Sequence, residues 1–295
     1  MSRILISGAS GLLGSALASS LEENSHEVVR LVRRKPRAAN EAQWDPTRPI
    51  LPQLVSGFDV VVHLSGENIA GRWTEQKKCR IRDSRVFSTD FLSQALAKAE
   101  RKPSTFICAS AIGYYGNRGD EILTEESRSG DGFFPEVCRE WERATEPASD
   151  AGIRVVNLRI GIVLSREGGA LKQMLVPFKL GLGGRLGDGS QYWSWIQIAD
   201  FISGVRHVLE NDRLAGPVNM TAPNPATNAE FTETLATVLK RPAKLAIPSF
   251  VAKLAFGELA EETMLSSTRV EPTKLMGSGF QFRHHELKDA LEHLL

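Results

Sequence analysis

The chain has 295 residues, of which 42% are hydrophobic and 24% are charged, and its formal net charge is +1. These are ordinary values for a globular protein, and so small a charge excludes the basic footprint of a nucleic-acid-binding protein or a polybasic membrane surface. No apolar run approaches the ~20 residues that span a bilayer, and the first strand leaves no room for a leader, so we expect a cytoplasmic protein that acts on a small molecule.

The cysteines and histidines give no sign of a metal centre. The three cysteines, Cys79, Cys108 and Cys138, are an odd number without metal-type spacing, and the six histidines are scattered. We therefore predict free thiols and no bound metal. At this length the chain is expected to form one large domain, or a main domain with a smaller lobe.

The first chemical signal follows the apolar strand Ile4-Leu5-Ile6. The glycines there have G-x-x-G-x-x-G spacing, and the apolar residues after them recur at helical intervals. In a strand, turn and helix of this kind, the glycines allow a tight turn, a close approach to a pyrophosphate and close packing of the helix, whose free N–H groups face the anion. The pattern predicts a dinucleotide cradle formed by Gly8, Ser10, Gly11, Leu12, Leu13 and Gly14.

The elements that follow alternate between strand and helix. Apolar runs predict strands at 27–32, 58–64, 105–110 and 154–159. Helical periodicity predicts a helix over 74–99, broken or bent, and another over 135–150. This alternation predicts an α/β fold, a doubly wound parallel sheet of the Rossmann type with right-handed crossovers.

The rhythm changes after Gly161, where glycines and tryptophans cluster. A helix at 198–209, a strand near 218–220, a helix that begins with the capping box Thr227 to Glu230, and a mostly helical tail are expected. We predict a Rossmann domain over 1–165 to which 197–222 return, and a smaller C-terminal α/β lobe. The lobe is assigned residues 166–196 and 223–295 and ends in the helical region 248–295.

Two arginines end the second strand. An NAD-binding unit places an acidic residue there for the ribose 2′-OH, whereas this chain has Arg33 and Arg34. A guanidinium cannot accept that hydrogen bond, but it can pair with a 2′-phosphate. The arginines therefore favour NADP(H) over NAD, with Arg33 the better candidate, although two basic residues also commonly cap a strand at the surface.

Polar residues follow two further strands. Leu64, Ser65 and Gly66 should pass under the adenosine and ribose, and Glu67 either projects into the crevice or caps a turn. Ser110, Tyr114 and Tyr115 follow the strand 105–110, where a nicotinamide would face a substrate. A tyrosine next to a cation can act as a general acid, so these three and Glu67 are the catalytic candidates. Packing over the loop is the other interpretation of the tyrosines.

The motifs occur in an order that resembles the extended short-chain dehydrogenase/reductase superfamily, of the NAD(P)-dependent epimerase/dehydratase type. The segments that carry the resemblance include the glycine turn, Leu64–Ala70, Asp83–Arg85, Gly113–Gly116, Arg159–Leu164 and Pro177–Gly184. They are most similar to an atypical branch of epimerase family proteins (family 39U), and the tail from Pro248 resembles that branch's C-terminal domain of unknown function.

The resemblance implies roles for further residues. Arg159 and Gly161 should lie beside the nicotinamide carboxamide, and Arg85 is a possible cation near the cofactor. Trp193 and Trp195 should either cover a substrate crevice or form the core of the smaller lobe.

The resemblance also shows what this chain lacks. The superfamily's catalytic Tyr-x-x-x-Lys pair is replaced by Val137 and Trp141, neither of which can transfer a proton. Two hypotheses follow: an NADP(H)-dependent epimerase or reductase that acts on a carbonyl or hydroxyl compound by other residues, or an NADP(H)-binding redox sensor or scaffold. A crevice with Ser110, Tyr114 and Glu67 and a whole lobe in front of it favours the first, and the missing pair favours the second.

Overall fold

The computed structural model describes all residues from 1 to 295 and is built on a seven-stranded sheet in the order β12-β7-β5-β4-β1-β2-β3. Every pairing in it is parallel, and Ile4 of β1 lies opposite Val28 of β2 and Val60 of β4. The strands are β1 (Arg3–Ser7), β2 (Glu27–Val32), β3 (Glu41–Gln43), β4 (Val60–His63), β5 (Thr105–Ala111), β7 (Arg154–Ile160) and β12 (Gly216–Met220). The expected doubly wound parallel sheet is confirmed.

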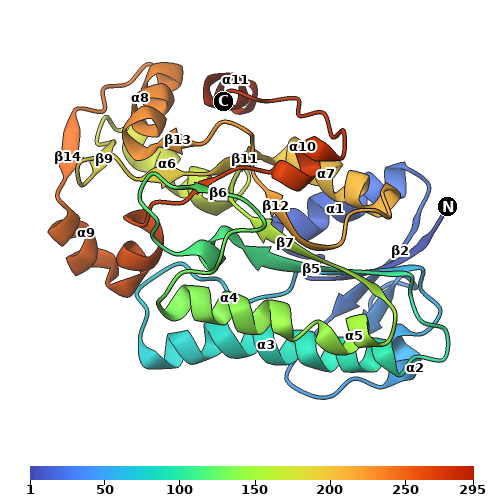
Figure 1. The fold of residues 1–295 in the computed structure, drawn as a ribbon. Coiled ribbons are helices and arrows are strands. Elements are labelled where there is room, and N and C mark those ends of the chain that lie inside the picture. Colours follow the sequence, from blue (N-terminus) through green and yellow to red (C-terminus); the bar gives the residue numbers. More distant parts are fainter.

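Helices cover both faces of the sheet (Figure 1). One face carries α1 (Leu12–Glu23), α7 (Ile198–Glu210) and α10 (Thr273–Gly277), and the other carries α2 (Pro52–Val55), α3 (Glu75–Ala97), α4 (Phe133–Arg143) and α5 (Glu146–Asp150). Successive strand residues point to opposite faces. Accordingly Ile4 packs in the core under α1 and α7, whereas its neighbour Leu5 packs in the core under α3.

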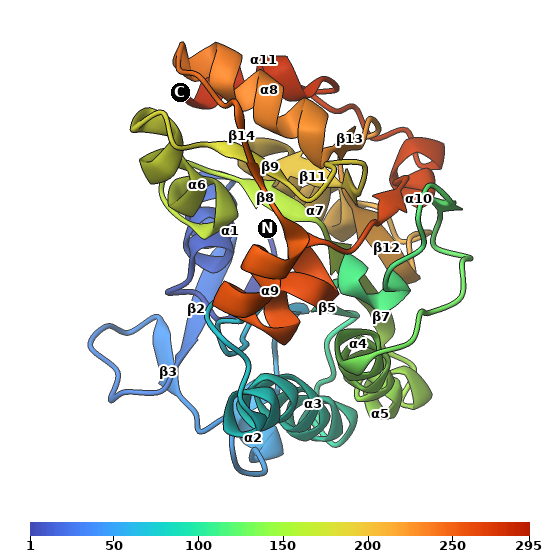
Figure 2. The ribbon, with the colours of Figure 1, turned by 90° about the vertical axis from the view of Figure 1, so that its left-hand side faces the viewer.

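The smaller lobe lies beyond the carboxyl ends of the strands (Figure 2). In that view α8 and α11 lie at the top, α2 and α3 at the bottom, and α9 between them. Trp195, Phe231 and Leu291 are central to the lobe's own core. Its helices are α6 (Gly169–Lys179), α8 (Asn228–Leu239), α9 (Ser249–Phe256), a π-helical turn (Ala260–Met264) and α11 (Leu287–Leu294). Its short strands are β8 (Ile162–Leu164), β9 (Gly184–Leu186), β10 (Tyr192–Trp193), β11 (Trp195–Gln197), β13 (Ala226–Thr227) and β14 (Leu245–Ile247).

Two predicted helices differ in the structure. The helix α3 is a single uninterrupted element of 23 residues, capped by the Thr74 hydroxyl. It has packing partners along its length, because Ile81 packs with side chains of α4, and Leu92 and Leu96 pack in the core against the sheet. The predicted helix over 135–150 is instead divided into α4 and α5. Pro147, in the first turn of α5, has no N–H to continue the earlier helix. The capping box from Thr227 to Glu230 is confirmed.

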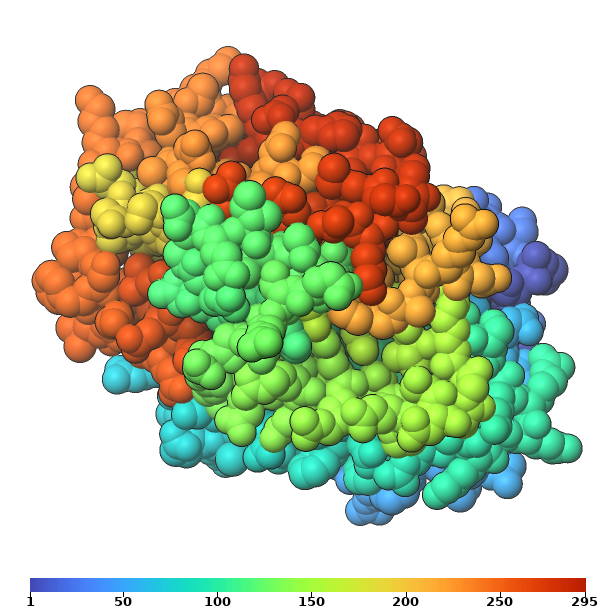
Figure 3. All heavy atoms as spheres, in the orientation of Figure 1, coloured from blue at the N-terminus to red at the C-terminus, as the bar shows by residue number.

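The C-terminal tail crosses both halves of the molecule. It includes the strand β15 (Arg269–Val270), which pairs with β6 (Ile122–Leu123), and Figure 3 shows the red tail beside the green loop that holds β6. Leu275, Phe280 and Phe282 pack in the core beneath α1 and α7. The tail is mostly helical, as expected, and also includes the short strand β15. The domain boundaries stay a prediction.

One carboxylate fixes the end of this tail. Both oxygens of Asp200, at the start of α7, accept hydrogen bonds 2.9 Å long from the backbone N–H groups of Arg283 and His284. Asp200 is fully buried, so these two bonds replace the water that it loses on folding.

None of the helices in this structure has the length and apolar character needed to cross a membrane.

Candidate functional site

A cavity of about 460 Å³ lies between the carboxyl edge of the sheet and the smaller lobe. One wall comes from the start of α1 and from residues 64–66, 109–113 and 160–163, which follow β4, β5 and β7. The opposite wall includes Trp193 and several residues between Glu262 and Thr268. In open α/β sheets ligands bind at this edge, so we take the cavity as the candidate active site.

The glycine turn at one end of the cavity requires its glycines. Gly8 has φ +73°, and a Cβ there would lie 2.7 Å from the carbonyl carbon of Leu64. A Cβ on Gly14 would lie 2.2 Å from the carbonyl oxygen of Gly8. The helix α1 has no side-chain cap, and the N–H groups of Leu12, Leu13 and Gly14 donate no hydrogen bond within the chain. This end of the cavity therefore fits the pyrophosphate of a dinucleotide.

Arg33 and Arg34 differ in what they contact. Both are exposed, but Arg34 donates two hydrogen bonds to the Glu41 carboxylate, at 2.8 and 2.6 Å. This contact lowers the pKa of Glu41 to about 2. Arg33 makes no hydrogen bond or ion pair. Its free guanidinium favours Arg33 as the residue that would contact a 2′-phosphate, and the roles of both arginines stay predictions.

Arg85 lies beside the segment that follows β4. Its guanidinium donates to the carbonyls of Ile81 and Glu67, at 3.0 and 3.1 Å, and lies 5.1 Å from the ring of Trp141. Its Nε is buried and has no hydrogen-bond partner. A buried donor without an acceptor is costly, so Arg85 fits a ligand oxygen such as that of a ribose. Leu64, Ser65 and Gly66 line the same part of the cavity.

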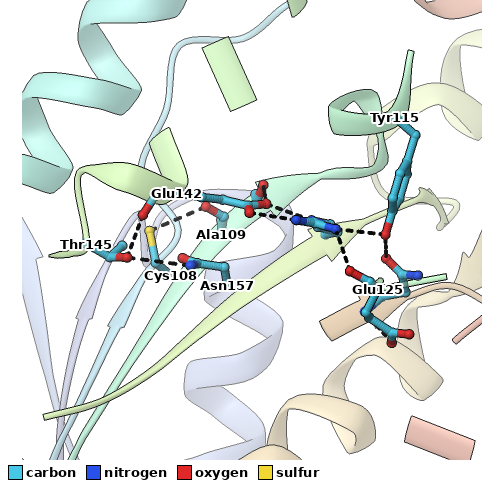
Figure 4. Close-up of polar contacts among 10 residues, drawn as sticks. Cys108, Ala109, Tyr115, Glu125, Glu142, Thr145 and Asn157 are labelled. Atoms are coloured by element: carbon cyan, nitrogen blue, oxygen red, sulfur yellow. Dashed lines mark hydrogen bonds and ion pairs between the residues drawn. The ribbon is translucent and has the colours of Figure 1, made fainter. Parts of the chain in front are cut away.

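The polar side chains at the end of β5 form one buried network (Figure 4). Ser110 donates to Glu142 of α4 at 2.7 Å, and Glu142 accepts two hydrogen bonds from Arg159 of β7, at 2.8 and 2.9 Å. Arg159 also donates to the Tyr115 hydroxyl at 3.0 Å, and Tyr115 donates to Asn219 at 2.7 Å. Figure 4 shows Glu142 and Tyr115 on opposite sides of the central guanidinium. The network joins α4 to two central strands beneath the cavity floor.

The charged groups of this network are Arg159 and Glu142, which form a buried ion pair. Burial alone would lower the pKa of Arg159, but its hydrogen bonds and its attraction to Glu142 outweigh burial and raise that pKa. Burial raises the pKa of Tyr115 to about 12, against the opposing effect of Arg159. Tyr115 is therefore a weak proton donor at neutral pH.

The structure separates the predicted catalytic residues. Ser110 lines the cavity, as does the predicted cofactor-binding residue Gly161. Tyr115, by contrast, is fully buried in the network, and the ring of Tyr114 lies 3.5 Å from the Arg159 guanidinium. Neither tyrosine is among the lining residues, which favours the packing interpretation of both.

Two further predicted residues also turn away from the cavity. Glu67 forms an ion pair with Lys77 at 2.7 Å, and the side chain of Arg159 points into the network, so neither lines the cavity. The catalytic and cofactor roles assigned to them stay predictions without a contact at the cavity.

The two positions at which the usual catalytic pair would stand are apolar and packed. Val137 is buried, and Trp141 lies in the cavity wall with its indole N–H donated to the Thr89 hydroxyl at 3.0 Å. Both Trp193 and Trp195 pack in the core of the smaller lobe, and only Trp193 also lines the cavity.

Two acidic residues of the site were not anticipated from the sequence. Glu142 lies one position after Trp141, at neither place of the usual pair, so the resemblance implies no role for it. Glu262 lines the cavity from the C-terminal region, and nothing in the local sequence marks it among its acidic neighbours Glu258 and Glu261.

Comparisons with known proteins agree with this geometry. The model of the NAD dependent epimerase/dehydratase family matches residues 4–220, and that of a domain of unknown function, DUF1731, matches residues 247–294. An epimerase family protein of Mycobacterium leprae is 43% identical, over 98% of this chain and 94% of the relative. The human epimerase family protein SDR39U1 is 36% identical, over 99% of each chain.

Solved structures show the same likeness. The crystal structure of human SDR39U1 with NADPH superposes with a TM-score of 0.91 at 34% identity, covering 99% of this chain and 98% of the human one. That of a nucleoside-diphosphate sugar epimerase from Corynebacterium glutamicum has a TM-score of 0.83 at 40% identity, covering 100% of this chain and 58% of the other.

Proposed function

Because the chain belongs to the NAD dependent epimerase/dehydratase family and carries its DUF1731 region, we propose that it is an NADP(H)-dependent oxidoreductase or epimerase. Its substrate would be a small carbonyl or hydroxyl compound, for which a sugar nucleotide is one candidate class. The expected family membership is confirmed, and the human relative crystallised with NADPH supports the choice of cofactor.

One observation carries the proposal: a single cavity joins the free N–H groups of α1 to the Ser110 region and to the polar residues of the smaller lobe. A dinucleotide bound along the carboxyl edge would occupy the first part and leave room for a substrate in the second. A cofactor-binding sensor would not need the second part, and no contact in the structure favours that alternative.

The residues of this chain have definable tasks in such a reaction. The N–H groups of Leu12, Leu13 and Gly14 would bind the pyrophosphate, Arg33 the 2′-phosphate, and the Nε of Arg85 a ribose oxygen. The cofactor would supply or accept a hydride. Because Ser110 already donates its proton to Glu142, its oxygen is free to accept a hydrogen bond from a substrate hydroxyl and so to orient it.

The proposal is tested by measuring NADPH and NADH binding calorimetrically and by following NADPH oxidation with a panel of aldehydes, ketones and keto sugars. We expect micromolar or tighter NADPH binding and turnover of at least one compound. Ser110→Ala should reduce turnover, whereas Tyr114→Phe should have a smaller effect because its hydroxyl is not at the cavity. Epimerisation consumes no NADPH, so sugar nucleotides are also assayed for the epimeric product. NADPH binding without oxidation of NADPH by any carbonyl compound, reduction of NADP by any alcohol, or formation of any epimer would contradict the enzyme and support the sensor.

A further inference from the structure

Glu262 is held at the cavity wall by the start of helix α4. Its Oε2 accepts a hydrogen bond 3.2 Å long from the backbone N–H of Phe134. A Cβ on Gly132, which precedes the helix, would lie 2.7 Å from Oε1 of Glu262. The carboxyl group therefore sits close against the end of the helix on which the family's catalytic pair would stand, although it comes from a turn far along the chain.

Few of the side chains that line the cavity can ionise, and Glu262 is one of them. Among all the residues that line the cavity, only Arg85 and Glu262 have side chains that can ionise. An arginine keeps its proton throughout the ordinary pH range. Glu262 is thus the one lining group that can both release and take up a proton, in a cavity where Val137 and Trp141 have replaced the usual pair.

The surroundings of Glu262 favour its protonated form. Burial raises its pKa, and the carboxylates of Glu258 and Glu261 add to that effect. The N–H groups of Phe134 and Phe133 oppose it but do not cancel it. Glu258 is paired with Lys78 at 3.1 Å, and Glu261 with Lys253 at 2.8 Å, so neither lysine contacts Glu262. A carboxyl group with a raised pKa can hold a proton ready to donate.

Two hydroxyl groups near Glu262 point to a polar ligand. Ser266 and Thr268 line the same wall, and neither hydroxyl makes a hydrogen bond within the chain. Neither is among the buried side-chain atoms that lack a partner, so both hydroxyls are open to the cavity. Oxygen atoms of a substrate would satisfy them and would be brought to the same wall as the carboxyl group.

We propose that Glu262 is the acid–base residue of this site, an inference that rests on the proposed function. In the reducing direction the substrate carbonyl gains a hydride equivalent at carbon from a reduced nicotinamide. The O–H bond of the Glu262 carboxyl group breaks as a new O–H bond forms on the carbonyl oxygen. Glu262 is left as a carboxylate and recovers its proton from water, and in the oxidising direction it takes the proton of the hydroxyl group.

The decisive variant is Glu262→Gln. Its amide oxygen can still accept the hydrogen bond from Phe134, so the contact at the helix end is kept and only the exchangeable proton is lost. Glu233→Gln is the matched control, because this exposed residue of α8 does not line the cavity and does not contribute to the pKa of Glu262. Each variant is compared with the wild type in NADPH affinity, in turnover of the best aldehyde or ketone of the panel, and in an infrared titration of the carboxyl carbonyl stretch.

We expect Glu262→Gln to keep NADPH affinity within about twofold and to lower kcat at least a hundredfold, in the range of general acid–base catalysis. It should also remove a carboxyl band that titrates above the ordinary range in the wild type. Glu262→Asp should restore part of kcat, and Glu233→Gln should behave as the wild type.

Two results would overturn the inference, and each differs from failure of the proposed function. If Glu262→Gln turns over the substrate as fast as the wild type and with the same pH profile, the proton on the carbonyl oxygen comes from another group. If the wild type reduces no probe, the proposed function fails, and the infrared titration then decides alone. In that case a Glu262 band that appears only below pH ~4, the ordinary pKa range of a glutamate, overturns the inference.

Discussion

Arg159 donates two parallel hydrogen bonds, 2.8 and 2.9 Å long, to the carboxylate of Glu142. Only 13% of the Glu142 side chain and 3% of the Arg159 side chain are exposed. The same helix carries a second paired glutamate, Glu140, whose partner Arg82 is 54% exposed. The two ion pairs have similar geometry and differ mainly in burial. Comparing the loss of each glutamate therefore shows how burial changes the contribution of an ion pair to the free energy of unfolding.

The first prediction concerns these two glutamates. Glu142→Ala should lower the free energy of unfolding by about 3–5 kcal/mol, because it leaves the Arg159 charge buried without a partner. Glu140→Ala should cost about 1 kcal/mol or less, since water solvates Arg82 once its partner is gone. Urea unfolding at neutral pH measures both. Equal small losses would show that water reaches Arg159.

The second prediction concerns the preference between NADPH and NADH. Arg33→Glu should weaken NADPH binding at least tenfold more than NADH binding, because only NADPH has the 2′-phosphate that the free guanidinium would pair with. Lys102→Glu makes the same change of charge just before β5, at the amino-terminal ends of the strands and away from the cavity, and should leave the preference unaltered. Calorimetry with both cofactors is the measurement. An equal loss of both affinities would dismiss this role for Arg33.

The third prediction concerns the glycine turn. Gly14→Ala places a methyl group 2.2 Å from the Gly8 carbonyl oxygen, so the turn must open and the N–H groups of α1 must move. NADPH affinity should fall at least a hundredfold. Gly277→Ala is the control, because nothing lies within 4 Å of its added methyl group. If Gly14→Ala bound NADPH as tightly as the wild type does, the pyrophosphate would not lie on this turn.

The fourth prediction follows from a buried histidine. His63 lies between the hydroxyls of Ser7 and Ser88, at 2.6 and 3.2 Å, and burial lowers its pKa from 6.5 to about 3. Between these two values the unfolded chain binds more protons than the folded one. The contribution of His63 is therefore complete above pH 6.5 and is lost as the pH falls toward 3.

The measurement is the unfolding free energy in urea from pH 7 to pH 4. The wild type should lose stability through this group at up to ~1.4 kcal/mol per pH unit. His63→Asn should show a shallower decline than the wild type, whatever its stability at pH 7. The exposed His293→Asn should keep the wild-type slope. Parallel slopes in all three proteins would count against a neutral buried His63.

The fifth prediction concerns the three thiols. Cys79 is exposed on α3, whereas Cys108 and Cys138 are buried, and burial raises the pKa of each to about 12. An aromatic disulfide reagent should therefore modify one thiol in the folded protein and three in urea. Cys79→Ser should abolish the reaction of the folded protein. A second fast thiol would mean that α4 opens readily.

Much of the fold could be predicted from the sequence because its signals are local. The turn at Gly8 and the apolar strands each depend on residues close in the chain, and their alternation restricts the topology to few choices. The errors also have local causes. The many charged residues in the first half of α3 led to the expectation that this helix is broken or bent. The apolar periodicity predicted one helix over 135–150, but Pro147 divides it into α4 and α5.

The candidate site was harder to predict because its contacts join distant segments. Tyr115 has the chemistry of a general acid, but the buried Arg159 that holds it lies 44 residues away. Phe134 and Glu262 are separated by 128 residues. Neither spacing nor residue type indicates such a contact, so Glu142 and Glu262 emerged only with the structure.

The packing of Leu275, Phe280 and Phe282 against Ile4 and its neighbours has a consequence for synthesis. The core around β1 is completed by side chains that the ribosome adds only after all seven strands of the central sheet have been made. Chains grow from the N-terminus and domains generally fold as units. Part of the core around β1 therefore stays uncovered until residues 275–282 have been synthesised.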